Sequence, residues 1–110
     1  MSNEISREEL SQLVQSNQAV VLEVLPPKYY AEGHLPGARN LPLDRFEQVL
    51  TELALDRNAP IVTYCTGPTC ANSGVAAARL GQLGYANVRV FKGGKEAWRA
   101  AGLALSLPSQ

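Results

Sequence analysis

Residues 60–70, PIVTYCTGPTC, decide the fold, because a strand-like run leads straight into a loop that holds both cysteines of the chain. The run from Ile61 to Tyr64 combines β-branched and aromatic residues and follows a proline, which predicts a strand. An alanine-rich helix is expected from Val75 to Leu83, with Gly84 at its left-handed end. The strand, the loop and the helix are therefore expected to be contiguous, with Cys65 at the carboxyl end of the strand.

Apolar runs and helical patterns alternate on both sides of this unit. Capping boxes mark two helix starts, at Ser6 and at Asp44, where an acidic residue follows three positions later. Strand-like runs cover 19–25 and 88–91, and helices are predicted at Arg7–Ser16, at the apolar stripe Phe46, Val49, Leu50 and Leu53, and at Lys95–Ala101. The tail from Leu103 can add a short edge strand. This alternation predicts one three-layer α/β domain over residues 1–110, with a mainly parallel sheet and helices on both faces.

Composition and charge narrow the possible functions. Ten basic and ten acidic residues give a net charge of zero, so neither nucleic acid nor an anionic membrane is an expected partner. The chain opens with polar and acidic residues and has no apolar run near the ~18 residues of a membrane span, which predicts a cytoplasmic protein. Two cysteines and His34 cannot supply the four ligands of a structural zinc site, so no metal or other cofactor is expected.

Cys65 is the predicted nucleophile. Ligands of open parallel sheets bind beyond the carboxyl ends of the strands, where loops meet helix N-termini. In the loop after Cys65, Gly67 permits unusual backbone angles, and backbone N–H groups can converge on an anion. Such a site lowers the pKa of a thiol from its reference of ~8.5 and favours the nucleophilic thiolate. The alternative is a buried and inert cysteine at a strand end.

Cys70 lies five positions beyond Cys65 and can act together with it. In a tight loop it reaches back to form a disulfide, or to attack a sulfur atom carried on Cys65. In an open loop it is a small residue that packs the start of the helix. His34, on a loop between Gly33 and Leu35, is expected to fix that loop by a hydrogen bond rather than to act as a general base.

Five stretches of the chain carry a family resemblance: VVLEV, YYAEGHLPGARNLPL, PIVTYC with its loop, AAARLGQLGYANVRVFKGGKEAW and AGLAL. In order and spacing they resemble a single-domain rhodanese-like protein over nearly the whole chain. The resemblance implies a mainly parallel, five-stranded sheet and a cradle loop whose cysteine takes sulfane sulfur from a small donor. The implied persulfide on Cys65 is held by the loop and passed to a thiol acceptor. The implied substrate-binding residues are Thr66, Gly67, Pro68, Thr69 and Ala71.

The loop departs from the C-x-x-G-x-R pattern of many active family members, in which the arginine attracts an anionic donor. Pro68 and Cys70 stand at the glycine and arginine positions. The first strand, which usually ends in Asp-Val-Arg, here ends in Glu-Val-Leu at residues 23–25. These changes weaken the case for thiosulfate as the donor. Lys92 and Lys95 flank a Gly-Gly turn and either approach the same sheet edge or lie in a solvated turn.

Three functions remain open at this point. The first is a sulfurtransferase that carries a persulfide on Cys65, with Cys70 resolving it as a disulfide that a small thiol or a thioredoxin-like protein reduces. The second is a dithiol redox protein or sensor in which the same pair cycles without carrying sulfane sulfur. The third is a non-catalytic rhodanese-like binding module. The retained Cys65 and Gly67 argue against the third, and the missing arginine motivates the second.

Overall fold

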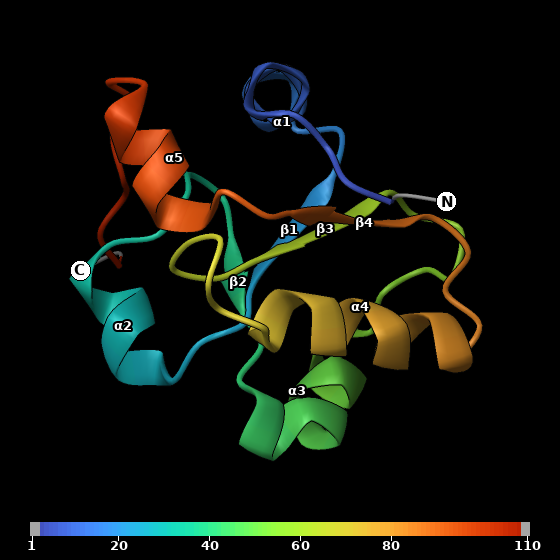
Figure 1. Cartoon of the computed structure of the whole chain (residues 1–110). Helices are drawn as coiled ribbons and strands as arrows, with labels where there is room; N and C mark the ends of the chain where they lie inside the picture. The colour runs from blue at the N-terminus through green and yellow to red at the C-terminus, as the bar shows by residue number, and fades with distance from the viewer. Residues whose placement is uncertain (1–2, 109–110) are drawn as a thin grey trace.

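A parallel sheet of four strands forms the middle layer of the computed structural model, which describes residues 3–108. In sheet order the strands are β2 (Arg39–Asn40), β1 (Val20–Glu23), β3 (Ile61–Tyr64) and β4 (Val88–Phe91). One face is covered by α1 (Arg7–Ser16) and α5 (Gly94–Ala100), and the other by α3 (Phe46–Leu53) and α4 (Asn72–Gln82) (Figure 1). The predicted three-layer α/β fold is confirmed.

The sheet has four strands within residues 3–108, and not the five that the family resemblance implied. Two further pairings are single bridges, a parallel one between Glu4 and Val90 and an antiparallel one between His34 and Ser106. Ser106 exchanges two backbone hydrogen bonds with His34, and the pairing extends no further in the described part of the tail. The expected edge strand is therefore reduced to one residue pair, and residues 109–110 of that prediction lie outside the described residues.

Alternate residues of the two central strands enter different cores, because successive side chains of a strand point to opposite faces. Val21 and Val62 belong to the core under α1 and α5. Leu22 and Ile61 belong to the core against α3 and α4. This burial on both faces explains why the two strands appear in the sequence as nearly continuous apolar runs.

The start of α1 is confirmed, whereas the predicted cap at Asp44 is wrong. The Ser6 hydroxyl accepts a hydrogen bond from the Glu9 N–H at 3.1 Å, as a helix cap does. Asp44 instead lies inside a 3-10 turn, η1 (Leu43–Arg45), and α3 begins after Arg45 with no side-chain cap. The apolar stripe of α3 still faces the core, with Phe46 and Leu50 buried and Val49 and Leu53 packed against them.

Two further helices differ from the sequence expectation. The helix predicted to begin at Val75 begins at Asn72, so the cysteine loop is shorter than expected. A short helix that the sequence analysis did not predict, α2 (Pro27–Glu32), follows β1. None of the helices within residues 3–108 is long and apolar enough to cross a membrane.

Candidate active site

The cysteine loop connects the carboxyl end of β3 to the start of α4, as the sequence predicted. The backbone of α5 forms hydrogen bonds with the first part of this loop. The Lys95 N–H donates to the carbonyl oxygen of Cys65 at 3.1 Å, and the Glu96 N–H donates to that of Thr66 at 3.0 Å. The loop thus lies between α4 and α5, beyond the carboxyl edge of a parallel sheet, where ligands of such folds bind.

The loop offers fewer amide donors than the sequence suggested. Pro68 has no N–H, and the N–H of Cys70 is used in a turn to the carbonyl oxygen of Gly67 at 3.1 Å. Gly67 is buried, whereas Thr66, Pro68, Thr69 and Ala71 are exposed. A bound anion in this loop would therefore depend on the amides of Thr66, Gly67, Thr69 and Ala71.

Cys65 is buried, with 1% of its surface exposed. Its thiol donates to the carbonyl oxygen of Cys70 at 3.4 Å and lies 3.6 Å from the Ser73 hydroxyl. Burial raises the pKa of the Cys65 thiol, and a hydrogen bond with the Cys70 thiol adds to this, while Ser73 acts in the opposite direction. The expectation that the loop lowers the pKa of Cys65 is therefore wrong for the free thiol, because burial outweighs the polar contacts.

Cys70 has the opposite character. It is half-buried, and its partial burial is outweighed by hydrogen bonds from Cys65 and from the backbone of Asn72 and Thr66, so the pKa of the Cys70 thiol is lowered. Both cysteines are free thiols. Of the two thiols, the half-buried Cys70 is therefore the one that ionises at lower pH, and the buried Cys65 ionises at higher pH.

A hollow of about 340 Å³ opens beside Cys70. It is lined by Pro68, Thr69, Cys70, Ala71, Ser73, Gly74, Val90 and Lys92. Among the described residues that line this hollow, Lys92 is the cation, and its ammonium lies 3.8 Å from the Glu4 carboxylate, with both side chains largely exposed. The sequence analysis left open whether the two lysines approach the site, and the structure places Lys92 at the hollow.

His34 ties its loop to α2 by a hydrogen bond, as predicted. Its ring stacks on Tyr30 with centroids 3.9 Å apart, and Nδ1 donates to the Tyr30 carbonyl oxygen at 3.1 Å. Among residues 3–108, no three His, Cys, Asp or Glu side chains gather into a group that could hold a metal ion.

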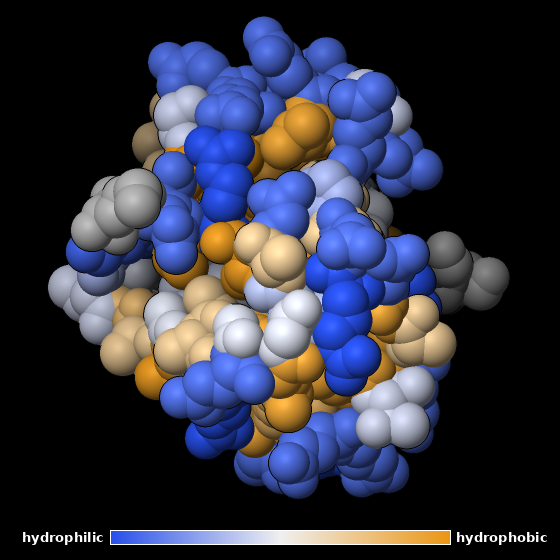
Figure 2. Space-filling view, turned by 90° about the vertical axis from the view of Figure 1, so that its right-hand side faces the viewer, coloured by the Kyte–Doolittle hydropathy of each residue, from blue (hydrophilic) through white to orange (hydrophobic). Residues whose placement is uncertain are grey.

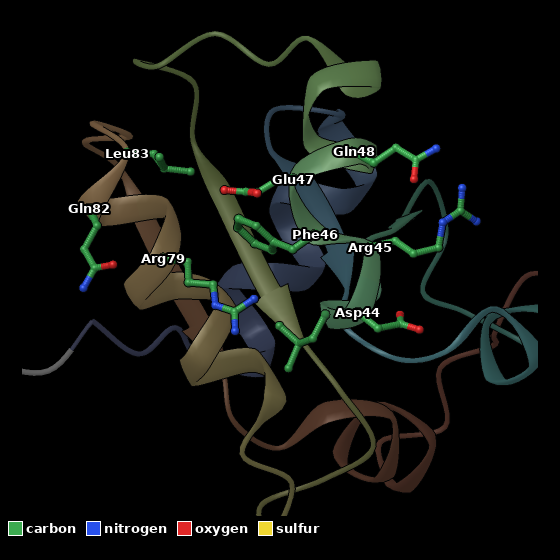
Figure 3. A pocket seen from close by; sticks show the side chains of 9 residues that line it. Asp44, Arg45, Phe46, Glu47, Gln48, Arg79, Gln82 and Leu83 are labelled. Atoms are coloured by element: carbon green, nitrogen blue, oxygen red, sulfur yellow. The ribbon is translucent and has the colours of Figure 1, made fainter.

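A second hollow, of about 500 Å³, lies between α3 and α4, away from the cysteine loop (Figure 3). Its nine lining residues are Leu43, Asp44, Arg45, Phe46, Glu47, Gln48, Arg79, Gln82 and Leu83, which include no thiol or imidazole. The Arg79 guanidinium lies over the Phe46 ring, 5.5 Å from its centroid. The face shown in Figure 2 is a mixture of hydrophilic and hydrophobic residues, without one broad apolar patch.

Sequence reasoning missed Ser73 and Asn72. Ser73 contacts the Cys65 thiol, and its carbonyl oxygen accepts from the Thr63 hydroxyl at 2.9 Å, so the start of α4 is tied to β3. The Asn72 side chain donates to the Val24 carbonyl oxygen at 3.2 Å, which ties it to the chain after β1. Two hydrogen-bonding residues directly after Ala71 could have indicated that the helix begins there. The helix start predicted at Val75 instead left both residues in the loop.

Comparisons with known proteins match this fold. A model of the rhodanese-like domain matches residues 6–101. A protein named sulfurtransferase from Allochromatium vinosum is 35% identical over 109 residues, covering 98% of each chain. The HTH-type transcriptional regulator Rv0324 of Mycobacterium tuberculosis is 34% identical over 99 residues, which cover 90% of this chain and 42% of the regulator. The crystal structure of the BH2092 protein from Bacillus halodurans superposes with a TM-score of 0.87 at 30% identity, covering 96% of this chain and 77% of that one.

Proposed function

This chain belongs to the rhodanese-like family and is a sulfurtransferase of the rhodanese type, and we propose that it carries sulfane sulfur as a persulfide on Cys65. The observation that carries the proposal is the pairing of two free thiols in one loop, with the Cys65 thiol 3.4 Å from the Cys70 carbonyl oxygen. The expected partners are a small sulfur donor and a thiol acceptor.

Loading begins when the Cys65 thiol loses its proton to solvent. The Cys65 thiolate then attacks the sulfane sulfur of the donor. A bond forms between Cys65 and that sulfur, the S–S bond of the donor breaks, and the donor's leaving group departs with the electron pair. The outer sulfur of the persulfide then carries the negative charge that the loop amides and the Ser73 hydroxyl can stabilise.

Two routes discharge the persulfide. In the first, an acceptor thiolate attacks the outer sulfur, so sulfur is transferred and the Cys65 thiolate is released. In the second, Cys70 attacks the inner sulfur, a Cys65–Cys70 disulfide forms and hydrosulfide leaves. The disulfide is reset by two electrons from a small dithiol, two monothiols or a thioredoxin-like protein. The closed loop, in which Cys65 contacts the backbone of Cys70, supports the second route.

The charge around the loop influences which sulfur donor is favoured. No arginine stands in the loop, and Lys92, the cation of the hollow beside Cys70, also faces Glu4. An anionic donor such as thiosulfate therefore gains less attraction here than at a loop with a fixed arginine. We expect a persulfide or polysulfide donor to load Cys65 faster than thiosulfate does.

The intact-protein mass of the reduced protein tests the proposal. The wild type, Cys65→Ser and Cys70→Ser are each exposed briefly to thiosulfate or to a polysulfide. The proposal predicts that the wild type gains the mass of one sulfur atom, that Cys65→Ser gains none, and that the gain lasts longest in Cys70→Ser. Serine is the matched replacement because it keeps the size of each side chain.

A second candidate function is a dithiol redox protein or sensor. The two free thiols in one loop favour it, because a buried thiol of raised pKa beside a half-buried thiol of lowered pKa is also suited to disulfide exchange. In that case the wild type loses the mass of two hydrogens under the same donors, and no variant ever carries extra sulfur.

A further inference from the structure

A buried ion pair lies beneath the cysteine loop. The Lys95 ammonium is 3.1 Å from Oε2 of Glu23, and the two side chains are 6% and 0% exposed. Lys95 also donates to the carbonyl oxygen of Tyr29 at 2.8 Å, and the Tyr64 hydroxyl donates to Oε1 of Glu23 at 2.7 Å. Glu23 therefore joins α5 to the end of β3, although the three residues are far apart in the sequence.

This pair is coupled directly to the loop at two points. Tyr64, which Glu23 holds, is the residue before Cys65, and its hydroxyl also accepts from the Leu35 N–H at 3.0 Å. Lys95, which Glu23 holds on the other side, donates its own N–H to the Cys65 carbonyl oxygen at 3.1 Å. Any shift of either partner of Glu23 is thus passed to the backbone of Cys65.

Helix α5 and the loop also lie too close to slide past each other. A methyl group added at Gly94 would collide with the carbonyl oxygen of Cys65 and with the backbone of Thr66 and Gly67. Interfaces packed this tightly transmit displacements rather than absorb them. The place of α5, which the ion pair fixes, therefore fixes the place of the loop.

Stability alone does not account for charges at this position. A buried ion pair costs desolvation of both ions, and a well-packed apolar pair of similar volume is often as stable or more so. The pair does provide directional contacts that hold three separate segments in one arrangement, which apolar side chains do not. What the pair adds is therefore geometric.

We propose that Glu23 and Lys95 are positioning residues, whose ion pair holds the Cys65–Gly67 segment so that the Cys65 thiol stays against Cys70 and Ser73. They touch neither donor nor acceptor. They act on the thiols by holding the backbone of the loop. The sulfur-transfer part of this proposal rests on the proposed function, whereas the effect on the two thiols does not.

The test uses Lys95→Met, Lys95→Arg and the double variant Glu23→Gln/Lys95→Met. Lys95→Arg keeps the charge, and the double variant leaves no charge unpaired, so it is the variant most able to fold normally. Leu50→Ala is the control, because Leu50 lies on α3 in the other core, whose buried residues do not include the loop, and the substitution lowers stability there. Unfolding in urea ranks the variants by stability.

The first readout is the pH dependence of alkylation of each cysteine, followed by peptide mass. In the wild type, Cys70 is expected to react at lower pH than Cys65. In Lys95→Met and in the double variant the two profiles should move together, by about one pH unit, which is a tenfold change in thiolate fraction. Lys95→Arg and Leu50→Ala should keep the separation of the wild type.

The second readout is the rate at which Cys65 is loaded with sulfur. We expect a loss of about 10- to 100-fold in Lys95→Met and in the double variant, the size expected when a reacting group shifts by about 1 Å. Loading should recover in Lys95→Arg and stay near normal in Leu50→Ala.

Two results would overturn the positioning role. One is a double variant that keeps both the alkylation profiles and the loading rate. The other is a Leu50→Ala variant that loses them to the same degree, which would make the effect one of general stability. If the wild type itself never carries extra sulfur, the proposed function fails, but the alkylation profiles still decide whether Glu23 and Lys95 position the thiols.

Discussion

Gly94→Ala should disturb the cysteine loop more than a glycine-to-alanine substitution at another left-handed position does. Gly94 has a φ of +61°, and an added methyl group would meet the carbonyl oxygen of Cys65 and the next two residues of the loop backbone. Gly102 is a matched control, since its φ is +79° and an added methyl group there meets nothing within 4 Å. The two substitutions share the cost of a left-handed alanine, and only Gly94→Ala adds a collision.

The magnitudes follow from these two terms. A left-handed non-glycine residue costs about 1–2 kcal/mol, and forcing extra volume into a packed interface costs about 1–3 kcal/mol more. Gly102→Ala is thus expected to lower the free energy of unfolding by about 1–2 kcal/mol, and Gly94→Ala by about 2–5 kcal/mol. Since the colliding atoms are loop backbone, Gly94→Ala should also slow sulfur loading about tenfold or more, whereas Gly102→Ala should leave it unchanged.

Urea unfolding of the reduced proteins and the loading rate at Cys65 measure both effects. Equal losses of stability in the two variants, together with normal loading in Gly94→Ala, would refute the reasoning. That outcome would mean that α5 and the loop move apart without consequence for the thiols.

Three further outcomes are expected. Lys92→Gln should slow loading from thiosulfate roughly fivefold, because one charge at ~4 Å in water contributes about 1 kcal/mol. The control variant Lys28→Gln should load from thiosulfate at the wild-type rate, and Lys92→Gln should load normally from an uncharged trisulfide. An equal loss with both donors would contradict an electrostatic role of Lys92. Tyr64→Phe should lower the free energy of unfolding by about 1–3 kcal/mol, because the Leu35 N–H and a Glu23 oxygen lose their buried partner. The control Tyr85→Phe, measured in the same urea titration, should lower it by less than about 0.5 kcal/mol. Equal losses of stability in the two variants would count against the buried network around Tyr64. Near neutral pH, iodoacetamide should label Cys70 before Cys65, because the pKa of Cys70 is lowered and that of Cys65 is raised. The difference between the two labelling rates should shrink as the pH rises and Cys65 ionises. Preferential labelling of Cys65 at neutral pH would contradict these pKa directions.

Strands β3 and β4 could be predicted from the sequence because runs of β-branched residues leave a plain signal. The runs at 61–64 and 88–91 match the central strand β3 and the edge strand β4 in both bounds. The pairing of the tail was not predictable in the same way. A single bridge at Ser106 depends on where His34 lies in space, and no periodicity in the tail records that.

The position of Cys65 could be predicted, but its acidity could not. A strand end followed by a glycine-containing loop and a helix places a thiol at a ligand-binding edge, and the structure places Cys65 there. Its pKa depends on how deeply the loop folds over it and on the contact with Cys70, which are tertiary properties. The same holds for Lys95, because its burial depends on Glu23, 72 positions earlier in the chain.

The most direct test of the account locates the sulfur atom itself. The reduced wild type is given one equivalent of a persulfide donor, quenched within one turnover with an alkylating agent, digested and analysed by peptide mass. We expect the added sulfur atom to be bound first to the sulfur of Cys65. It should then be lost as a Cys65–Cys70 disulfide forms. Added sulfur that stays on Cys70, or a disulfide that forms with no persulfide before it, would contradict the claim that Cys65 is the carrier.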